Sequence, residues 1–232
     1  MSRSATKLRL TATPEPTLRI GKAERAQAEI LDAAFEFLWS RAFREMTVNS
    51  LMATTALSRS VFYRYFSDVH ALMEQLLTRL ETEILEGVSA WITGVGDPVA
   101  LLYESLTAEV RICYLHGPFL KAVSDAAGMD ENVEMAWRKF LGSFDDAVSE
   151  RIALDQDLGL IEEFDPVPVA TALNRLDAST FIEAFGQRPR NRPEPLLDAN
   201  ARIWISTLYG TQWAATKSST LIRPNAVDQG AR

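Results

Sequence analysis

Residues 47–66 read TVNSLMATTALSRSVFYRYF and have the spacing of two short helices joined by a turn. In the first half, helical intervals separate Val48, Leu51, Met52 and Thr55. Thr47 stands directly before them, where its hydroxyl can accept a hydrogen bond from a free amide of the first turn. This half therefore predicts a short helix that begins after a threonine cap.

The second half of the stretch predicts another short helix. Ala56 and Leu57 break the first pattern, and Ser58 is a residue type that often caps helices. An apolar face then recurs at i, i+1, i+4 and i+5, formed by Val61, Phe62, Tyr65 and Phe66. Two such helices can form a helix-turn-helix, which leaves the first residues of the second helix free to enter the major groove of DNA.

Several side chains on the second helix have the chemistry that DNA contacts require. Arg59 can make two hydrogen bonds to a guanine edge, and Ser60 can reach a base edge or a phosphate. Tyr63 and Tyr65 carry hydroxyls toward the DNA backbone, and Arg64 can bring positive charge to a phosphate. The alternative for the two tyrosines is that their rings only cover the small core of the helix pair.

The start of the first helix is a second candidate contact. Thr47 and Ser50 can direct hydroxyls and amides at another phosphate. Phe62 and Phe66 are expected in the core, not against DNA. The predicted DNA-binding residues are Thr47, Ser50, Ser58, Arg59, Ser60, Tyr63, Arg64 and Tyr65.

The distribution of charge agrees with DNA binding by this end of the chain. The whole chain has a net charge of -7, with 24 Lys and Arg against 31 Asp and Glu. Residues 1–66 hold ten of the basic residues against six acidic ones, which is +4, so residues 67–232 hold fourteen against twenty-five, which is -11. A local basic face suffices for phosphate binding, although such an asymmetry can also arise by chance.

A family resemblance adds to this interpretation. The run FYRYF at residues 62–66 resembles the end of the second helix in the TetR family of bacterial transcriptional repressors. Residues 170–181 (ATALNRLDASTF) and 202–210 (RIWISTLYG) are similar to the last two helices of EthR-like members. The resemblance implies an all-α fold, with an N-terminal three-helix helix-turn-helix head and a C-terminal helical-bundle body for ligand binding and dimerisation.

Three places depart from the pattern of that family. The turn holds Thr55 and Ala56 where a small residue and a glycine are usual, and Val61 stands in place of a threonine. Val69 replaces a lysine, which removes an expected phosphate contact. These departures favour a second interpretation, in which the chain is a ligand-binding helical dimer that has lost specific DNA recognition.

The remaining chain reads as helices separated by turn signals. GVGDP at residues 94–98 is a break in which Asp97 can cap the next helix and Pro98 can occupy its first position. Ser67 is the expected cap of the helix before this break. His116, Gly117 and Pro118 predict an interruption between two helices. The expected helices span residues 24–41, 67–91, 98–115, 119–127, 131–157, 169–185 and 194–213.

These segments divide into four regions. Residues 1–21 mix Ser, Thr, Pro and basic residues without an apolar face, so a flexible basic arm is predicted there. The other predicted regions are a DNA-binding domain at 22–66, a helical ligand-binding and dimerisation domain at 67–216, and a flexible tail at 217–232.

Aromatic and polar residues in the body predict a ligand cavity. Asn174 and Asp177 lie three apart on a helix face that is otherwise apolar, so they require polar partners. Those partners can be a neighbouring helix, a dimer mate or a ligand, and the aromatic stripe of residues 131–157 can equally be ordinary bundle core. The predicted ligand-binding residues are Trp137, Phe140, Phe144, Asn174, Asp177, Phe181 and Trp204.

The resemblance to EthR-like proteins supports this cavity and places Asp177 where an asparagine is expected. A carboxylate there favours a ligand with a donor or cationic group, or is itself protonated in an apolar site. Apolar residues of the last two helices exceed what one chain needs, which predicts a homodimer. They are Leu173, Leu176, Ile203, Leu208 and Tyr209.

Other functional classes have weak support in the sequence. The 47% hydrophobic content is enough for a core, but no apolar run is long enough for a membrane span, so a cytoplasmic chain with no membrane partner is expected. Cys113 is the single cysteine and reads as a core or pocket thiol. With His70 and His116 far apart and no catalytic or cofactor motif, an all-α enzyme is only the third interpretation and no cofactor is predicted.

The sequence therefore predicts a homodimeric transcriptional repressor. It is expected to bind double-stranded DNA at a near-palindromic operator, and a small, mostly apolar or amphipathic effector is expected to release it. Carboxylates on outward helix faces, such as Asp145, Asp146 and Glu150, are expected only to be solvated.

Overall fold

A computed structural model describes residues 22–187 and 189–210, and every regular element in that part of the chain is helical. The predicted all-α class is confirmed. The predicted arm at 1–21 and tail at 217–232 lie outside the described residues. The elements are α1 (Lys22–Leu38), the 3-10 turn η1 (Phe43–Glu45), α2 (Val48–Met52), α3 (Arg59–Phe62), α4 (Val69–Ile92), α5 (Pro98–Ala127), α6 (Glu131–Asp157), α7 (Pro166–Phe185) and α8 (Pro193–Leu208).

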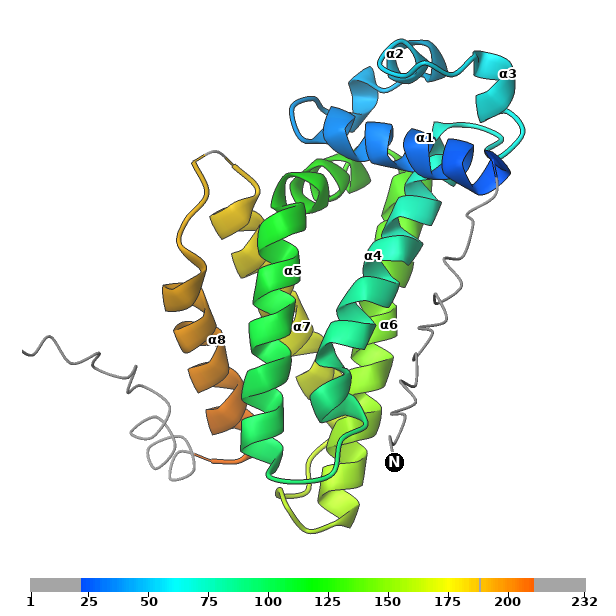
Figure 1. Cartoon of the computed structure of the whole chain (residues 1–232). Helices are drawn as coiled ribbons and strands as arrows, with labels where there is room; N and C mark the ends of the chain where they lie inside the picture. The colour runs from blue at the N-terminus through cyan, green and yellow to red at the C-terminus, as the bar shows by residue number, and fades with distance from the viewer. Residues whose placement is uncertain (1–21, 188, 211–232) are drawn as a thin grey trace, which may run out of the picture.

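Helices α1, α2 and α3 form a small head that lies across one end of a bundle made by α4 to α8 (Figure 1). Apolar side chains from all three head helices are fully buried, including Ile30, Leu51 and Phe62. The helix-turn-helix predicted at residues 47–66 is present, with α2 and α3 as its two short helices. Helix α4 leaves the head and runs along the bundle, so it belongs to both parts of the molecule (Figure 1).

The caps of two helices decide where the long α4 begins and ends. Asp68 caps α4, because its Oδ1 accepts hydrogen bonds from the amides of His70 and Ala71, both at 2.9 Å. The prediction that Ser67 is this cap is wrong. The predicted break at residues 94–98 is confirmed, since Asp97 caps α5 and Pro98 occupies its first turn.

Helix α5 corrects another expectation. The structure has one helix of 30 residues where the glycine and proline predicted two. Pro118 cannot donate an amide hydrogen bond, and the helix bends instead of stopping, so that its last turns pass beneath α1 (Figure 1). Tight packing holds the bend: a Cβ on Gly117 would lie 2.4 Å from the Phe185 carbonyl oxygen, and Phe119 is fully buried and stacks on Phe35 of the head.

The far end of the bundle holds a second core, and it corrects the predicted dimer surface. Leu173, Leu208 and Tyr209 are buried inside their own chain, against residues such as Trp91 and Trp204. They are therefore not spare apolar surface. Of the predicted surplus residues, Ile203 on α8 is the one with substantial exposure, at 41%.

Candidate DNA-binding head and ligand cavities

The first residues of α3 are exposed at the tip of the head. Ser58, Arg59 and Ser60 all face solvent. Arg59 donates a hydrogen bond from Nη1 to Oδ1 of Asn49 on α2, at 2.9 Å, which orients its guanidinium group beside the helix pair. A guanidinium has five N–H donors, so others remain for a base edge or phosphate. Ser58 occupies the cap position but makes no capping bond, because its hydroxyl pairs with that of Ser60 at 2.8 Å.

The aromatic residues of the head divide into core and surface. Phe62 and Phe66 are buried, as predicted, while Tyr63 is 60% exposed. Tyr65 is half-buried and packs on the head core, so its ring has a structural role whatever its hydroxyl contacts. Arg64 is exposed beside them.

The start of α2 is fixed by a reciprocal cap. The Ser50 amide donates to Oγ1 of Thr47 at 3.0 Å, and the Thr47 amide donates to Oγ of Ser50 at 2.9 Å. Ser50 also donates its hydroxyl proton within the head, to the Glu45 carbonyl at 3.0 Å. Thr47 is more exposed than Ser50, so it is the better placed of these two predicted phosphate contacts.

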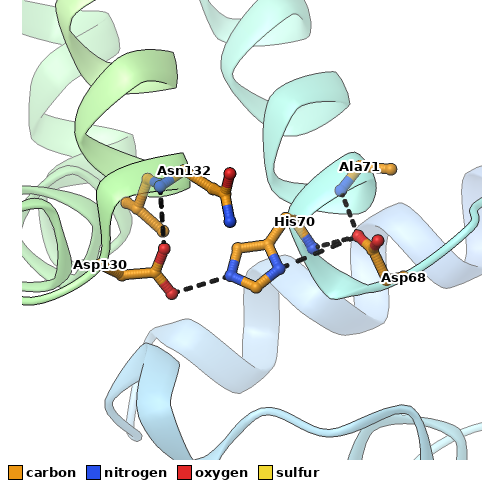
Figure 2. A network of polar contacts seen from close by, with 6 residues as sticks. Asp68, His70, Ala71, Asp130 and Asn132 are labelled. Atoms are coloured by element: carbon orange, nitrogen blue, oxygen red, sulfur yellow. Dashed lines mark hydrogen bonds and ion pairs between the residues drawn. The ribbon is translucent and has the colours of Figure 1, made fainter.

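The head is tied to the body at the start of α4. Figure 2 shows His70 lying between Asp68 and Asp130, with Nε2 of His70 2.8 Å from Oδ2 of Asp130. Asp130 in turn caps α6 by accepting from the amides of Asn132 and Val133. The hydrogen bond from His70 is the largest cause that lowers the pKa of Asp130. One histidine thus connects the first turn of α4 to the first turn of α6.

A second connection joins the end of α1 to the body. Arg190, which precedes α8, lies over the rings of Trp39 and Tyr114, with its guanidinium carbon 5.2 and 4.1 Å from the two ring centres. Cation–π contacts of this kind hold a loop against two different helices. The segment before α8 therefore contacts both the head and α5.

Two small adjoining cavities lie within the bundle, with volumes of about 30 and 40 Å³. Both are walled by Ile84 of α4, Phe144 of α6 and Asn174 of α7. Predicted ligand-binding residues surround them: Trp137, Phe140 and Phe181 line one, and Trp204 lines the other. Apolar walls with a few polar groups are typical of small-molecule sites.

Asn174 and Asp177 occupy different environments. The Asn174 side chain lines both cavities and donates from Nδ2 to Oδ1 of Asp145 at 2.9 Å. Asp145 also receives a bidentate pair from Arg175, at 3.2 and 2.8 Å, so its predicted role as a merely solvated carboxylate is wrong. Asp177 does not line either cavity; it lies behind the wall, 2% exposed, and accepts from Asn200 of α8 at 2.7 Å.

Glu109 of α5 is a cavity residue that the sequence analysis missed. Its side chain lines both cavities, and burial raises its pKa to about 7. The available signal was its spacing, because Leu102, Leu106, Glu109 and Cys113 share one helix face that is otherwise apolar. Cys113 itself is buried and lines one cavity, as expected of a core or pocket thiol.

The end of α4 away from the head is anchored by a buried polar network. Arg151 of α6 forms an ion pair with Asp155, Nε to Oδ1 at 3.0 Å, and donates to the carbonyls of Trp91 and Gly94. The hydroxyl of Tyr209 accepts from Nε1 of Trp91 at 2.8 Å and donates to Oδ2 of Asp155 at 2.6 Å. Helix α4 is therefore fixed at this end and passes the cavities before it reaches the head.

Two classes of site find no support in the described ranges 22–187 and 189–210. Nowhere in them do three His, Cys, Asp or Glu side chains come together as potential metal ligands. Within the same ranges, each helix is too short or too polar to cross a lipid bilayer.

Family models match both parts of the chain. The model of the bacterial regulatory proteins of the tetR family matches residues 30–76, which hold the helix-turn-helix. The model of the C-terminal domain of the transcriptional regulator EthR matches residues 103–210, which hold most of the bundle.

Individual relatives agree with these matches. The HTH-type transcriptional regulator EthR of Mycolicibacterium smegmatis is 23% identical over 188 residues, covering 80% of this chain and 87% of its own. EthR of Mycobacterium tuberculosis is 27% identical over 188 residues, covering 78% and 86%. The solved structure of the fatty acid degradation regulator FadR from Bacillus halodurans shares the fold, with a TM-score of 0.68 at 10% identity. The match covers 77% of this chain and 93% of the FadR chain.

These proteins are transcriptional regulators and not enzymes, so the third interpretation of the sequence is set aside. The head that the tetR-family model matches carries an exposed α3, and the body that the EthR model matches carries the cavities. The chain is a DNA-binding transcriptional regulator of the TetR family, with an EthR-like C-terminal domain.

Proposed function

We propose that the chain is a homodimeric repressor that binds a near-palindromic operator and is released by a mostly apolar effector. The observation that carries this proposal is the position of α4. Its residues Ile84 and Leu85 line cavity walls, while Gln75 and Arg79 bond to Gln27 and Asp32 of α1 in the head. A ligand that changes the space beside α4 also changes where the head lies. The same helix thus connects ligand binding to DNA binding.

The geometry sets the scale of this coupling. Helix α4 has 24 residues and is therefore about 36 Å long, so a small tilt about its anchored end becomes a displacement of several Å at the head. Two recognition helices of a dimer must lie about 34 to 36 Å apart to enter successive major grooves. An effector that favours another separation by about 2.7 kcal/mol lowers operator affinity about 100-fold, and the operator weakens the effector by the same factor.

Fluorescence anisotropy with labelled DNA from the region flanking the gene tests the proposal directly. Saturable binding that resists competitor DNA of scrambled sequence is expected, at nanomolar concentration and moderate salt. Binding that is equally strong to the scrambled competitor supports the second interpretation, a ligand-binding dimer without specific recognition, which Val61 and Val69 motivate. Measuring at two salt concentrations separates the phosphate contribution from base recognition.

Arg59→Ala is expected to weaken operator binding by about 1 to 3 kcal/mol and to relax base preference at one position in each half-site. The reason is that Arg59 is exposed at the first turn of α3, where its guanidinium group can meet a guanine edge. The measurement is a titration against operators with single-base changes at fixed salt. Arg64→Ala is the matched comparison and should weaken binding to all DNA sequences by the same factor. If the base preference of Arg59→Ala is unchanged, Arg59 does not read a base.

Ile203→Glu is expected to convert the dimer to a monomer and to reduce operator binding at least tenfold, because one head makes about half the phosphate contacts. Ile203 is exposed on α8 while its neighbours Trp204 and Ile205 are buried, so the substitution spares the core. Sedimentation velocity at micromolar concentration measures the change. Val95→Glu, at a fully exposed loop position, is the control and should leave the mass unaltered. If the wild-type chain sediments as a monomer at micromolar concentration, the proposed dimer is wrong.

A further inference from the structure

Glu109 occupies an unusual position between the two cavities. It lines both of them, on a face of α5 that otherwise presents Leu102, Leu106 and Cys113. Its carboxylate makes no hydrogen bond or ion pair with any residue in the described part of the chain. An ionised carboxylate in such a site is costly unless something neutralises or solvates it. A positively charged ligand would supply the counter-charge that the described residues do not.

The other polar groups around the cavities also lack a positive charge. No Lys, Arg or His is among the described residues that line either cavity. The two arginines near the bundle interior have other partners, since Arg175 pairs with Asp145 and Arg151 pairs with Asp155. Glu109 is close enough to Asp177 and Cys113 to raise the pKa of both groups, and neither of them is basic.

The hydrogen-bonding groups of the walls are mainly acceptors. Because Asn174 donates its Nδ2 to Asp145, its carbonyl oxygen is left to accept from a ligand. The Ser105 hydroxyl is already used, accepting from the Trp91 amide at 3.0 Å and donating to the Val88 carbonyl at 2.9 Å. Behind the wall, the Asp177 carboxyl has the Asn200 amide and the Trp204 indole as its hydrogen-bonding neighbours.

Aromatic rings complete a site that suits a cation. Phe144 borders both cavities and packs edge to face on Phe140, with ring centres 5.0 Å apart. Trp91 and Trp204 line the first of the two cavities, and their ring centres are 5.9 Å apart. Ring faces attract ammonium groups, and this attraction is strongest where water is excluded.

We propose that the effector of this regulator is a lipophilic amine, whose protonated nitrogen lies between the Glu109 carboxylate and the Asn174 carbonyl oxygen while its apolar body fills the aromatic cavities. This proposal rests on the proposed function, because it assigns a chemical class to the effector of the same site. An anionic fatty acid would place a second negative charge beside Glu109, and a neutral lipid brings no positive charge to it.

The charge state of Glu109 gives the proposal a second consequence. The titratable groups that face it are Asp177 from α7 and Cys113 from its own helix, with Glu83 of α4 beyond Cys113; none of them is basic. Burial raises the pKa of Glu109 to about 7, so an arriving ammonium group must displace a proton near neutral pH. Amine binding should therefore tighten between about pH 6 and about pH 8.

The test compares three probes of equal chain length: decylamine, decanol and decanoate. Isothermal titration calorimetry on the full chain, without DNA, is expected to give a dissociation constant for decylamine about tenfold to a hundredfold below that for decanol, with decanoate weakest. Glu109→Gln should abolish this preference and the pH dependence. Glu104→Gln, at an exposed position of the same helix, should retain both. Equal binding of decylamine and decanol by the wild type overturns the proposal, as does an unchanged preference in Glu109→Gln.

A melting experiment shows whether the Glu109→Gln chain is folded. The folded chain holds the Glu109 proton more tightly than the unfolded chain, whose pKa is near 4.5, so this carboxyl lowers stability as pH rises from about 4.5 to about 7. The melting temperature of Glu109→Gln should therefore be higher than that of the wild type at about pH 8, and the difference should become smaller toward about pH 5. If that variant is unfolded, the pH dependence of wild-type binding decides: no tightening toward about pH 8 overturns the proposal.

Operator release is measured separately, so that the two proposals can fail independently. Decylamine that binds through Glu109 without releasing the operator leaves the ligand class standing and contradicts the coupling through α4. Failure of the chain to bind any operator contradicts the proposed function, while the calorimetry still decides the ligand class.

Discussion

Arg151→Ala is expected to lower the free energy of unfolding by about 3 to 5 kcal/mol, the usual effect of removing one partner from a buried ion pair. Arg151 is 5% exposed and Asp155 is fully buried, so the substitution leaves a carboxylate without its charge partner. It also removes the donor that satisfies the carbonyls of Trp91 and Gly94 at the end of α4. The cost therefore includes both a buried charge and two unpaired acceptors.

Urea denaturation followed by circular dichroism measures this loss. Arg138→Ala is the matched control, because Arg138 forms an ion pair with Glu134 of the same helix but both side chains are at least half exposed. The free energy of unfolding of Arg138→Ala should be lower than that of the wild type by less than about 1 kcal/mol. Similar midpoints for the two variants would show that the network does not anchor α4.

Local signals in the sequence predicted most helix limits. Asp97 and Pro98 act at the start of a helix, where a carboxylate caps free amides and a missing N–H costs nothing, so the structure agrees with them. Pro118 carries the same kind of signal in the middle of a helix, and there the prediction was wrong. Packing of Gly117 on the backbone of Phe185 compensates for the lost hydrogen bond, and a single sequence does not reveal that contact.

Periodicity identified apolar residues correctly but not their partners. Leu208 and Ile203 are both apolar positions of α8, yet Leu208 is 4% exposed and Ile203 is 41% exposed. Spacing along a helix does not distinguish burial against the same chain from burial against a second copy. The assignment of Leu208 to a dimer surface was wrong for this reason.

The cavity was predicted in outline, but its charge was not. Aromatic residues such as Trp137 and Phe144 were expected around a ligand and do line the cavities. Asp177 was also expected there and instead lies behind the wall, bonded to Asn200. Glu109 lines both cavities instead, and the sequence analysis assigned it no role. Deciding between them required the packing of α5 against α7.

Ala147→Phe is expected to imitate the effector and to lower operator affinity about 100-fold, which corresponds to about 2.7 kcal/mol of coupling. Ala147 lies on α6 and lines the cavity that Val88 and Trp91 of α4 also wall. A phenyl ring at this position fills space that an effector would occupy and displaces α4 near its fixed end. The head, bonded to α4 through the pairs Gln27–Gln75 and Asp32–Arg79, should move with it.

Three measurements separate this effect from simple damage. Overpacking can destabilise a core by about 1 to 3 kcal/mol, so a thermal melt must show a folded body, and sedimentation must show the wild-type mass. Ala100→Phe, at an exposed position on α5, adds the same ring away from the cavities and should keep wild-type operator affinity. Effector affinity should fall in the Ala147 variant because the site is filled. A folded variant of wild-type mass that still binds the operator at full strength would show that α4 does not couple the cavities to the head, since the same volume would then be accommodated without moving it.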